Sequence, residues 1–274
     1  MEQSEIIIEP GMGIKHYWRD LWRYRELFFF LAWRDILVRY KQTSIGIAWS
    51  VLRPLLTMIA FTLVFSKLAK LPSEGVPYPI LVFTALLPWQ FFSNALSEAS
   101  NSLIVNSNLL TKVYFPRLIV PTSSIIVSLV DFCISLGILA LLMLWYGFAP
   151  DWRILVLPFF LLLAFLASFG CSLWLSALNV KYRDFRYVVP FIVQFGLYIS
   201  PVGFSSTIVP EKWRLLYSLN PMVGVIDGFR WGLLGGKAQI YWSGILVSSL
   251  VALVIFFFGL RNFRDMERNF ADVI

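Results

Sequence analysis

Six apolar runs, separated by short polar segments, constrain the fold of this sequence more than any other feature. A helix needs about 20 apolar residues to cross the hydrocarbon core of a bilayer. Only 14% of the residues are charged, compared with about 25% in a soluble domain. The sequence therefore predicts an all-α membrane protein with six spanning helices, at residues 45–65, 80–104, 118–146, 154–178, 188–204 and 240–260.

The chain before the first apolar run divides into two parts. Residues 1–16 are expected to form a cytoplasmic tail, because they lack the basic and apolar segments of a cleavable signal peptide. Residues 17–41 contain neither Pro nor Gly and place charged and aromatic side chains on different faces. This pattern predicts an amphipathic helix at the membrane interface, or alternatively a plain basic anchor. Residues 42–274 are expected to form one six-span transmembrane domain.

The distribution of basic residues predicts the orientation of the chain. An even number of spans places both termini on one side, and most of the 23 Lys and Arg residues lie on that side. The side richer in Lys and Arg faces the cytoplasm, so both termini are expected to be cytoplasmic. Because these residues flank the apolar runs, the net charge of +7 predicts contact with membrane lipid rather than nucleic acid.

Motifs for ATP or metal binding are missing from the sequence. The nearest approach to a P-loop, at residues 235–238, lacks both the glycine spacing and the hydroxyl residue. Cys133 and Cys171 lie inside apolar runs and are expected to be packing residues rather than a disulfide or a metal site. We therefore expect no cofactor in this chain, and energy from a separate subunit or an ion gradient.

The segment between the fifth and sixth runs carries two short helix signals. Pro210 opens the first, Asn220 precedes Pro221 at the start of the second, and two glycines end it. A helix of about 14 residues covers about 21 Å, which is less than the core thickness of about 30 Å. We expect two half-inserted or interface-lying helices on the outer face. Their aromatic residues, expected in the interface belt or at an exit, are Trp213, Tyr217, Phe229 and Trp231.

Five stretches of the sequence, in order and between the appropriate spans, resemble one family. They read RDILVRYKQTSIGIAWSVLRP (34–54), FTALLPWQFFSNAL (83–96), NSNLLTKVYFPRLIVP (106–121), LNVKYRDFRYVVP (178–190) and LNPMVGVIDGFRWGLLG (219–235). They are similar to ABC exporter permeases that secrete lipid-linked polysaccharides: O-antigen, capsule and teichoic acid. The resemblance implies a homodimer in the bacterial plasma or inner membrane, with two copies of a separate ATPase subunit that hold ATP and Mg²⁺. It also implies a cargo of polysaccharide attached to a polyprenyl diphosphate.

A diphosphate carrier needs cationic donors near the cytoplasmic interface, and Arg can bind phosphate oxygens with two hydrogen bonds. Arg53 lies about two turns into the first predicted span, which suggests a place at an entrance gate. The residues that we expect to bind the carrier or form this gate are Arg34, Arg39, Tyr40, Lys41 and Arg53. The alternative is that the cations only follow the positive-inside rule.

Aromatic residues suit a polysaccharide cargo, because flat rings stack on the apolar faces of sugars while the hydroxyls stay hydrated. The candidates for a channel are Trp49, Trp89, Phe91, Phe92, Phe191, Phe195 and Tyr198. The alternative is that these rings pack in the bundle or face lipid.

The loop at 105–117 and the helix at 17–41 are expected to receive the motion of the ATPase. The candidate coupling residues are Asn108, Lys112, Tyr114 and Arg117; the alternative is that the loop is a simple connector. Acidic residues inside a membrane span are costly and point to function. Glu98 is expected near the cytoplasmic end of the second span, and Asp131 near the middle of the third. We expect a hydrogen-bonding role for Asp131, with an ion pair or proton coupling as alternatives.

Other functions fit parts of the sequence. An ABC exporter of a small lipid or drug shares the architecture, because a fold does not determine its substrate. A membrane transferase for lipid-linked sugars needs a base and clustered carboxylates, but the one histidine, His16, precedes the first helix. A proton-driven carrier would use Asp131 and Glu98, but no internal repeat supports it.

Overall fold

The computed structural model describes residues 14–41, 46–73, 75–182, 184–267 and 270. Most of the tail predicted at 1–16 and the first residue of the first predicted span, Ile45, lie outside the described residues. The described residues are helical and contain no β-strand, which confirms the all-α fold class.

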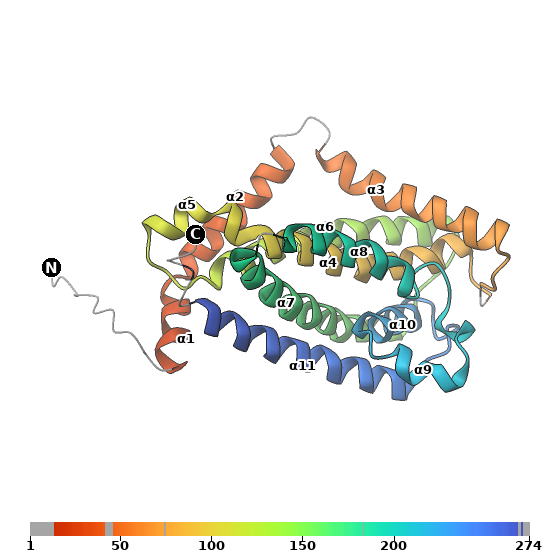
Figure 1. Cartoon of the computed structure of the whole chain (residues 1–274). Coiled ribbons are helices and arrows are strands. Elements are labelled where there is room, and N and C mark those ends of the chain that lie inside the picture. Colours follow the sequence, from red (N-terminus) through yellow and green to blue (C-terminus); the bar gives the residue numbers. More distant parts are fainter. Residues whose placement is uncertain (1–13, 42–45, 74, 183, 268–269, 271–274) are drawn as a thin grey trace.

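The chain forms α-helices with three short 3-10 or π segments between them (Figure 1). The elements are α1 (Ile14–Arg23), α2 (Arg25–Lys41), α3 (Gly46–Phe61), η1 (Thr62–Leu68), α4 (Tyr78–Val105), α5 (Ser107–Lys112), α6 (Ile119–Trp145), η2 (Trp152–Val156), α7 (Leu157–Lys181), α8 (Phe185–Ile199), η3 (Ser206–Ile208), α9 (Glu211–Tyr217), α10 (Pro221–Leu233) and α11 (Trp242–Glu267).

Five helical stretches are long and apolar enough to cross a membrane, and they match five of the six predicted spans. They are α3 with η1, α4, α6, η2 with α7, and α11. The remaining predicted span, 188–204, corresponds to α8, which is apolar but has only 15 residues, or about 22 Å. The helix ends early because Ser200 precedes Pro201 and takes an extended conformation, with ψ 152°.

The irregular segment after α8 is buried in protein, and side chains satisfy its backbone carbonyls. Arg230 of α10 donates to the carbonyls of Phe204 and Val202 at 2.8 and 3.0 Å. The hydroxyl of Tyr78 donates to the carbonyl of Gly203 at 2.7 Å. Irregular backbone at membrane depth is tolerated only where protein or water satisfies it, so Arg230 stabilises a turn that the apolar pattern did not reveal.

Helix α4 lies at the centre of the bundle. In its most apolar window 83% of the residues are buried, compared with 11% in the first span. It contacts α6, α7 and α10, while α7 also packs along α11. The α7–α11 contact is close enough that a Cβ atom on Gly259 would collide with the backbone of Gly170, a pairing of small residues that is common between membrane helices.

Helix α10, predicted to be half-inserted or to lie along the outer interface, does not take the interface position. Asn220 caps it by accepting a hydrogen bond from the Met222 amide at 3.0 Å, which confirms the predicted helix start. However, 11 of its residues are buried, because α4, α7 and α11 surround it. Phe229 is fully buried and its ring lies 6.0 Å from that of Phe132. The assignment of Phe229 to an interface belt or exit is therefore wrong. Its apolar surface is covered by protein.

The segment predicted as one helix at 17–41 forms two helices that meet at Tyr24. Helix α2 packs against α6, whereas Tyr17 of α1 donates a hydrogen bond to Glu267 of α11 at 3.0 Å. Neither Pro nor Gly marks the break, so tertiary contacts determine it. The first and last described helices meet at the end of the bundle that carries α5, which we call the α5 end; α9 lies at the opposite end (Figure 1).

Candidate functional site

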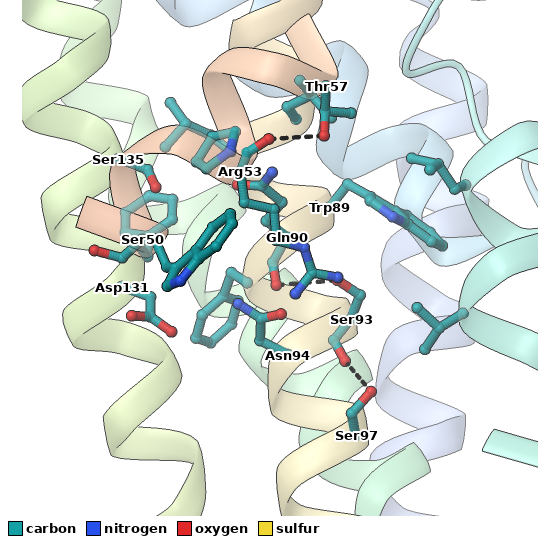
Figure 2. A pocket seen from close by; sticks show the side chains of 18 of the residues that line it. Ser50, Arg53, Thr57, Trp89, Gln90, Ser93, Asn94, Ser97, Asp131 and Ser135 are labelled. Atoms are coloured by element: carbon teal, nitrogen blue, oxygen red, sulfur yellow. Dashed lines mark hydrogen bonds between the residues drawn. The ribbon is translucent and has the colours of Figure 1, made fainter. Parts of the chain in front are cut away.

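A cavity of about 600 Å³ lies between α3, α4, α6 and α8, and we call it the polar groove (Figure 2). Its lining is unusual for the interior of a membrane bundle, because hydroxyl, amide and charged side chains make up about half of it. These polar residues are Arg39, Ser50, Arg53, Thr57, Gln90, Ser93, Asn94, Ser97, Asp131, Ser135 and Gln194.

One wall of the groove is a row of polar side chains along α4. Gln90 and Asn94 are four residues apart, so they project from the same helix face. The hydroxyls of Ser93 and Ser97 donate to backbone carbonyls of the preceding turn, at 3.1 and 2.8 Å. In contrast, the side-chain amides of Gln90, Asn94 and Gln194 make no hydrogen bond with the described residues. These three amides are therefore available to a ligand.

Arg53 is the cation that α3 contributes to the groove. Its side chain is exposed and points from α3 into the groove, on the side where Gln90 and Asn94 lie (Figure 2). Within the part of the chain that the structure describes, its guanidinium makes no hydrogen bond or ion pair. A cation without a counter-charge at the edge of a membrane bundle is suited to bind an anionic group.

Arg39 lies at the α5 end of the groove and is paired with two acids. Its guanidinium lies 2.8 Å from Oδ2 of Asp131 on α6 and 3.3 Å from Oε1 of Glu98 on α4. The neighbouring Tyr40 hydroxyl donates a hydrogen bond to Oδ1 of Asp131. Burial, together with the hydrogen bond to Asp131 and its charge, raises the pKa of Tyr40, so the phenol stays a neutral donor.

The two acids of this cluster lie at different points along their helices. Glu98 lies seven residues before Val105, the last residue of α4, towards the α5 end. Asp131 lies at the middle of α6, which agrees with its predicted place near the middle of the third span. Asp131 Oδ2 is buried and accepts no hydrogen bond from a described residue, so its contact with Arg39 is an ion pair without hydrogen-bond geometry.

A second cavity, of about 290 Å³, lies between α2, α4 and α6 on the α5 side of the groove. We call it the α5-side cavity. Arg34 lines it and is also paired: it donates to Asp35 at 2.7 Å and to the side-chain carbonyl of Asn106 at 2.8 Å. Asn106 precedes α5 at the N-cap position, and its side chain makes no capping hydrogen bond. Lys41 is exposed at the end of α2 and lines neither cavity.

The predicted channel aromatics fall into three groups. Trp49, Trp89 and Phe91 line the groove. Phe92 is buried beside Trp89, with 5.6 Å between ring centroids; it packs in the bundle and does not reach the groove. The exposed rings of α8 form the third group and lie outside the groove lining: Phe191, Phe195 and Tyr198.

The remaining predicted residues lie at the two ends of the bundle. At the α9 end, Trp213 is exposed, Tyr217 donates to the carbonyl of Ile199 at 2.7 Å, and Trp231 lies between Arg153 and Trp242. At the α5 end, three of the predicted coupling residues are exposed: Asn108, Lys112 and Tyr114.

The fourth coupling residue, Arg117, is bound to the end of α11. Its backbone amide donates to Oε1 of Glu267 at 2.8 Å, and its guanidinium donates to the Glu267 carbonyl at 3.0 Å. Because Glu267 also accepts from Tyr17, one carboxylate joins α1, the α5–α6 loop and α11. Burial raises the pKa of Tyr17, so its hydroxyl remains a donor to this carboxylate.

The amides of the groove and Glu267 are not among the residues that the sequence predicts for the site. The prediction covers aromatic rings and cations, whereas the groove is also lined by Gln90, Asn94 and Gln194. Polar residues spaced by four inside an apolar run would have indicated the α4 wall. Nothing local marks Glu267. Among the described residues, no group of three or more His, Cys, Asp or Glu side chains is placed to hold a metal ion.

Comparison with known proteins identifies the family. Residues 26–234 match the family of ABC-2 type transporters. The chain is 31% identical to an O-antigen export system permease protein RfbA of Myxococcus xanthus, over 77% of this chain and 82% of that protein. It is 26% identical to a protein of the same name from Klebsiella pneumoniae, over 88% and 92%. It is 23% identical to the capsule polysaccharide export inner-membrane protein CtrC of Neisseria meningitidis, over 82% and 86%.

These relatives are inner-membrane transport components rather than enzymes, and permeases of this kind work with a separate ATPase subunit. The family match covers the polar groove, the Arg39 cluster and both cavities. The chain therefore belongs to the ABC-2 type transporter family, as a multi-pass permease subunit of the inner membrane.

Proposed function

We propose that this chain is the membrane-spanning subunit of a bacterial ABC exporter for a polysaccharide carried on a polyprenyl diphosphate. O-antigen and capsule polysaccharide are the cargoes named for its relatives. Two copies of a separate ATPase subunit hold ATP and Mg²⁺, and this chain holds no cofactor. The observation that carries the proposal is the polar groove, where unpaired amides lie beside indole rings.

The groove suits a glycan because it offers two kinds of weak contact. The amides of Gln90, Asn94 and Gln194 each present donors and an acceptor to sugar hydroxyls. The rings of Trp49 and Trp89 present flat apolar surfaces to the C–H faces of the sugar. Many weak contacts hold a polymer without fixing its register, which allows it to slide.

The anionic group of the carrier is matched by Arg53. The resemblance to polysaccharide exporters suggested several cations for a diphosphate, but Arg34 and Arg39 are already neutralised by carboxylates. Arg53 lines the same groove as the amides and has no counter-charge among the described residues. A diphosphate beside Arg53 gains a bidentate ion pair without first displacing an acid.

A homodimer accounts for the two poorly covered walls of the groove. In the first span only 11% of the apolar window is buried, and Val189 is the one residue of α8 with a buried side chain. A second copy of the chain, packed against α3 and α8, closes the open groove into a passage. With the α5 end in the cytoplasm, the exposed Lys112 and Tyr114 face the ATPase.

Glycan export in cells tests this proposal. The variant Gln90→Met/Asn94→Leu keeps side-chain volume but removes both amides from the groove. With the partner ATPase co-produced, we expect several-fold less glycan at the cell surface and unchanged amounts of both proteins in the membrane. The control is Asn262→Leu on α11, whose amide only bonds to the preceding turn. Unchanged export in the double variant, or export without the ATPase, would contradict the proposal.

A further inference from the structure

The polar groove and the α5-side cavity meet at one side chain. Among the described residues that line them, Arg39 is the one residue common to both. The two cavities lie on the same flank of α4, so a ligand that moves directly from one to the other along α4 passes this guanidinium. Asn101 lines the α5-side cavity and Ser97 lines the groove, and these two residues lie one helical turn apart on either side of Arg39's partner Glu98.

Three helices hold Arg39 in this position. It extends from α2 and is fixed by Asp131 on α6 and by Glu98 on α4. The side chain of Asp131 is only 11% exposed, whereas that of Glu98 is 52% exposed. Water screens the exposed pair, so the contact with Asp131 is the stronger one. Tyr40 adds a second contact between α2 and the same carboxylate.

We propose that Arg39 is the gate residue between the two cavities, closed in this structure, and that it opens when the end of α2 moves away from α4 and α6. Asp131 is the positioning residue of this gate, and Glu98 completes it. The gate deepens the proposed function, because it gives the polar groove a controlled entrance on the α5 side. The chemistry supports a switch. Separating α2 returns three charged groups to water, and their hydration offsets part of the lost ion-pair energy.

Labelling of single cysteines tests the gate without any glycan. The experiment uses the full chain with its ATPase in membrane vesicles, in a Cys133→Ser/Cys171→Ser background. Ser97→Cys reports on the groove and Asn101→Cys on the α5-side cavity. A sulfonated maleimide, which cannot cross lipid, is added from the side of the α5 end. Labelling of Lys112→Cys on exposed α5, in matching vesicles prepared without the ATPase, verifies the orientation.

With Arg39 present, we expect Asn101→Cys to react rapidly and Ser97→Cys slowly. With Arg39→Met, Ser97→Cys should react about tenfold faster, the change expected when an open state populated at about 10% becomes the main one. Asn101→Cys should keep its rate. Arg39→Lys retains the charge and should restore slow labelling in part, while Asp131→Asn should open the gate more than Glu98→Gln.

Two results would overturn the gate. If Ser97→Cys reacts at the same rate with and without Arg39, the side chain does not separate the cavities. If Arg39→Met raises the labelling rates of both cysteines equally, the residue has only a structural role, and its loss increases the mobility of the whole α5 end of the bundle. A negative labelling result would contradict the gate but would not affect the export test with Gln90→Met/Asn94→Leu. The two proposals are therefore tested separately.

Discussion

The two sides of α4 differ in how they are covered. On one side, α7, α10 and α11 form a close-packed core in which Arg230 is 1% exposed and Gly170 meets Gly259 at backbone contact. On the other side, α3 and α8 lie against α4 with most of their large apolar side chains exposed. The polar groove lies between this second pair and α4. The bundle thus has a rigid half that supports the site and a loosely covered half that is free to be closed by a partner or moved.

Replacing Arg230 should lower the stability of the protein most, because Arg230 lies in the close-packed half of the bundle. Arg230→Met leaves the buried carbonyls of Leu81, Val202 and Phe204 without this donor. Each unsatisfied group costs about 1–3 kcal/mol, so we expect little folded protein in the membrane and a strongly lowered melting temperature in detergent. The matched control is Lys212→Met on exposed α9. Normal melting of the Arg230 variant would mean that the turn after α8 is held in another way.

Gly259→Ala should produce the next largest effect. The added methyl group collides with the backbone of Gly170, and α7 and α11 must separate. Overpacking of this kind costs about 1–3 kcal/mol, which thermal melting will detect. Gly137→Ala on α6 is the control, because nothing lies within 4 Å of its added Cβ. Equal melting of the two variants would remove the distinction between the halves.

Gly196→Ala tests the loosely covered half of the bundle at the wall of the polar groove. Its Cβ would lie 2.6 Å from the ring of Trp89, so the indole must move within the groove wall. Because this side of the bundle is loosely covered, we expect near-normal melting but several-fold lower glycan export. Ile192→Ala, an exposed position of α8, serves as the control. Loss of folding rather than export would place Gly196 in the rigid half.

Phe195→Leu should have the smallest effect on the single subunit. The ring is 52% exposed and lies against that of Phe191, with 4.3 Å between centroids and 35° between the ring planes. Exposed substitutions change stability by less than about 0.5 kcal/mol, so melting of the monomer should be unchanged. If a second copy covers α8, the dimer fraction measured by light scattering should fall. A melting temperature lowered as far as by Gly259→Ala would show that α8 belongs to the packed core.

The spans could be predicted because they depend on length and apolarity alone. Five predicted runs match helices, with ends that differ by at most seven residues, and Asn220 marks the start of α10 as its sequence indicates. Gly235 and Gly236 adopt φ of 61° and 73° after α10, a conformation that glycine permits. These features depend on residues that are adjacent in the sequence, so the sequence predicts them.

The sequence could not show which polar residues find partners. Arg34, Arg39 and Arg53 look alike within one stretch, yet two are paired with acids and one is not. Arg34 pairs with the adjacent Asp35, whereas the partners of Arg39 are Glu98 and Asp131, which lie 59 and 92 positions away in the chain. The packing of α2 against α6 brings Arg39 to them. Similarly, Phe229 and Trp213 are both aromatic residues of the two short helices predicted on the outer face, but of these two only Phe229 is surrounded by protein.

By itself, the sequence determined that this protein is a helical bundle in a membrane, because long apolar runs have no other stable state in water or lipid. It also determined the family, through motifs that keep their order along the chain. Only the tertiary structure decided where the site lies. The groove, the pairing of Arg39 and the burial of α10 all depend on contacts between distant helices, and such contacts follow from shape and packing rather than from local composition.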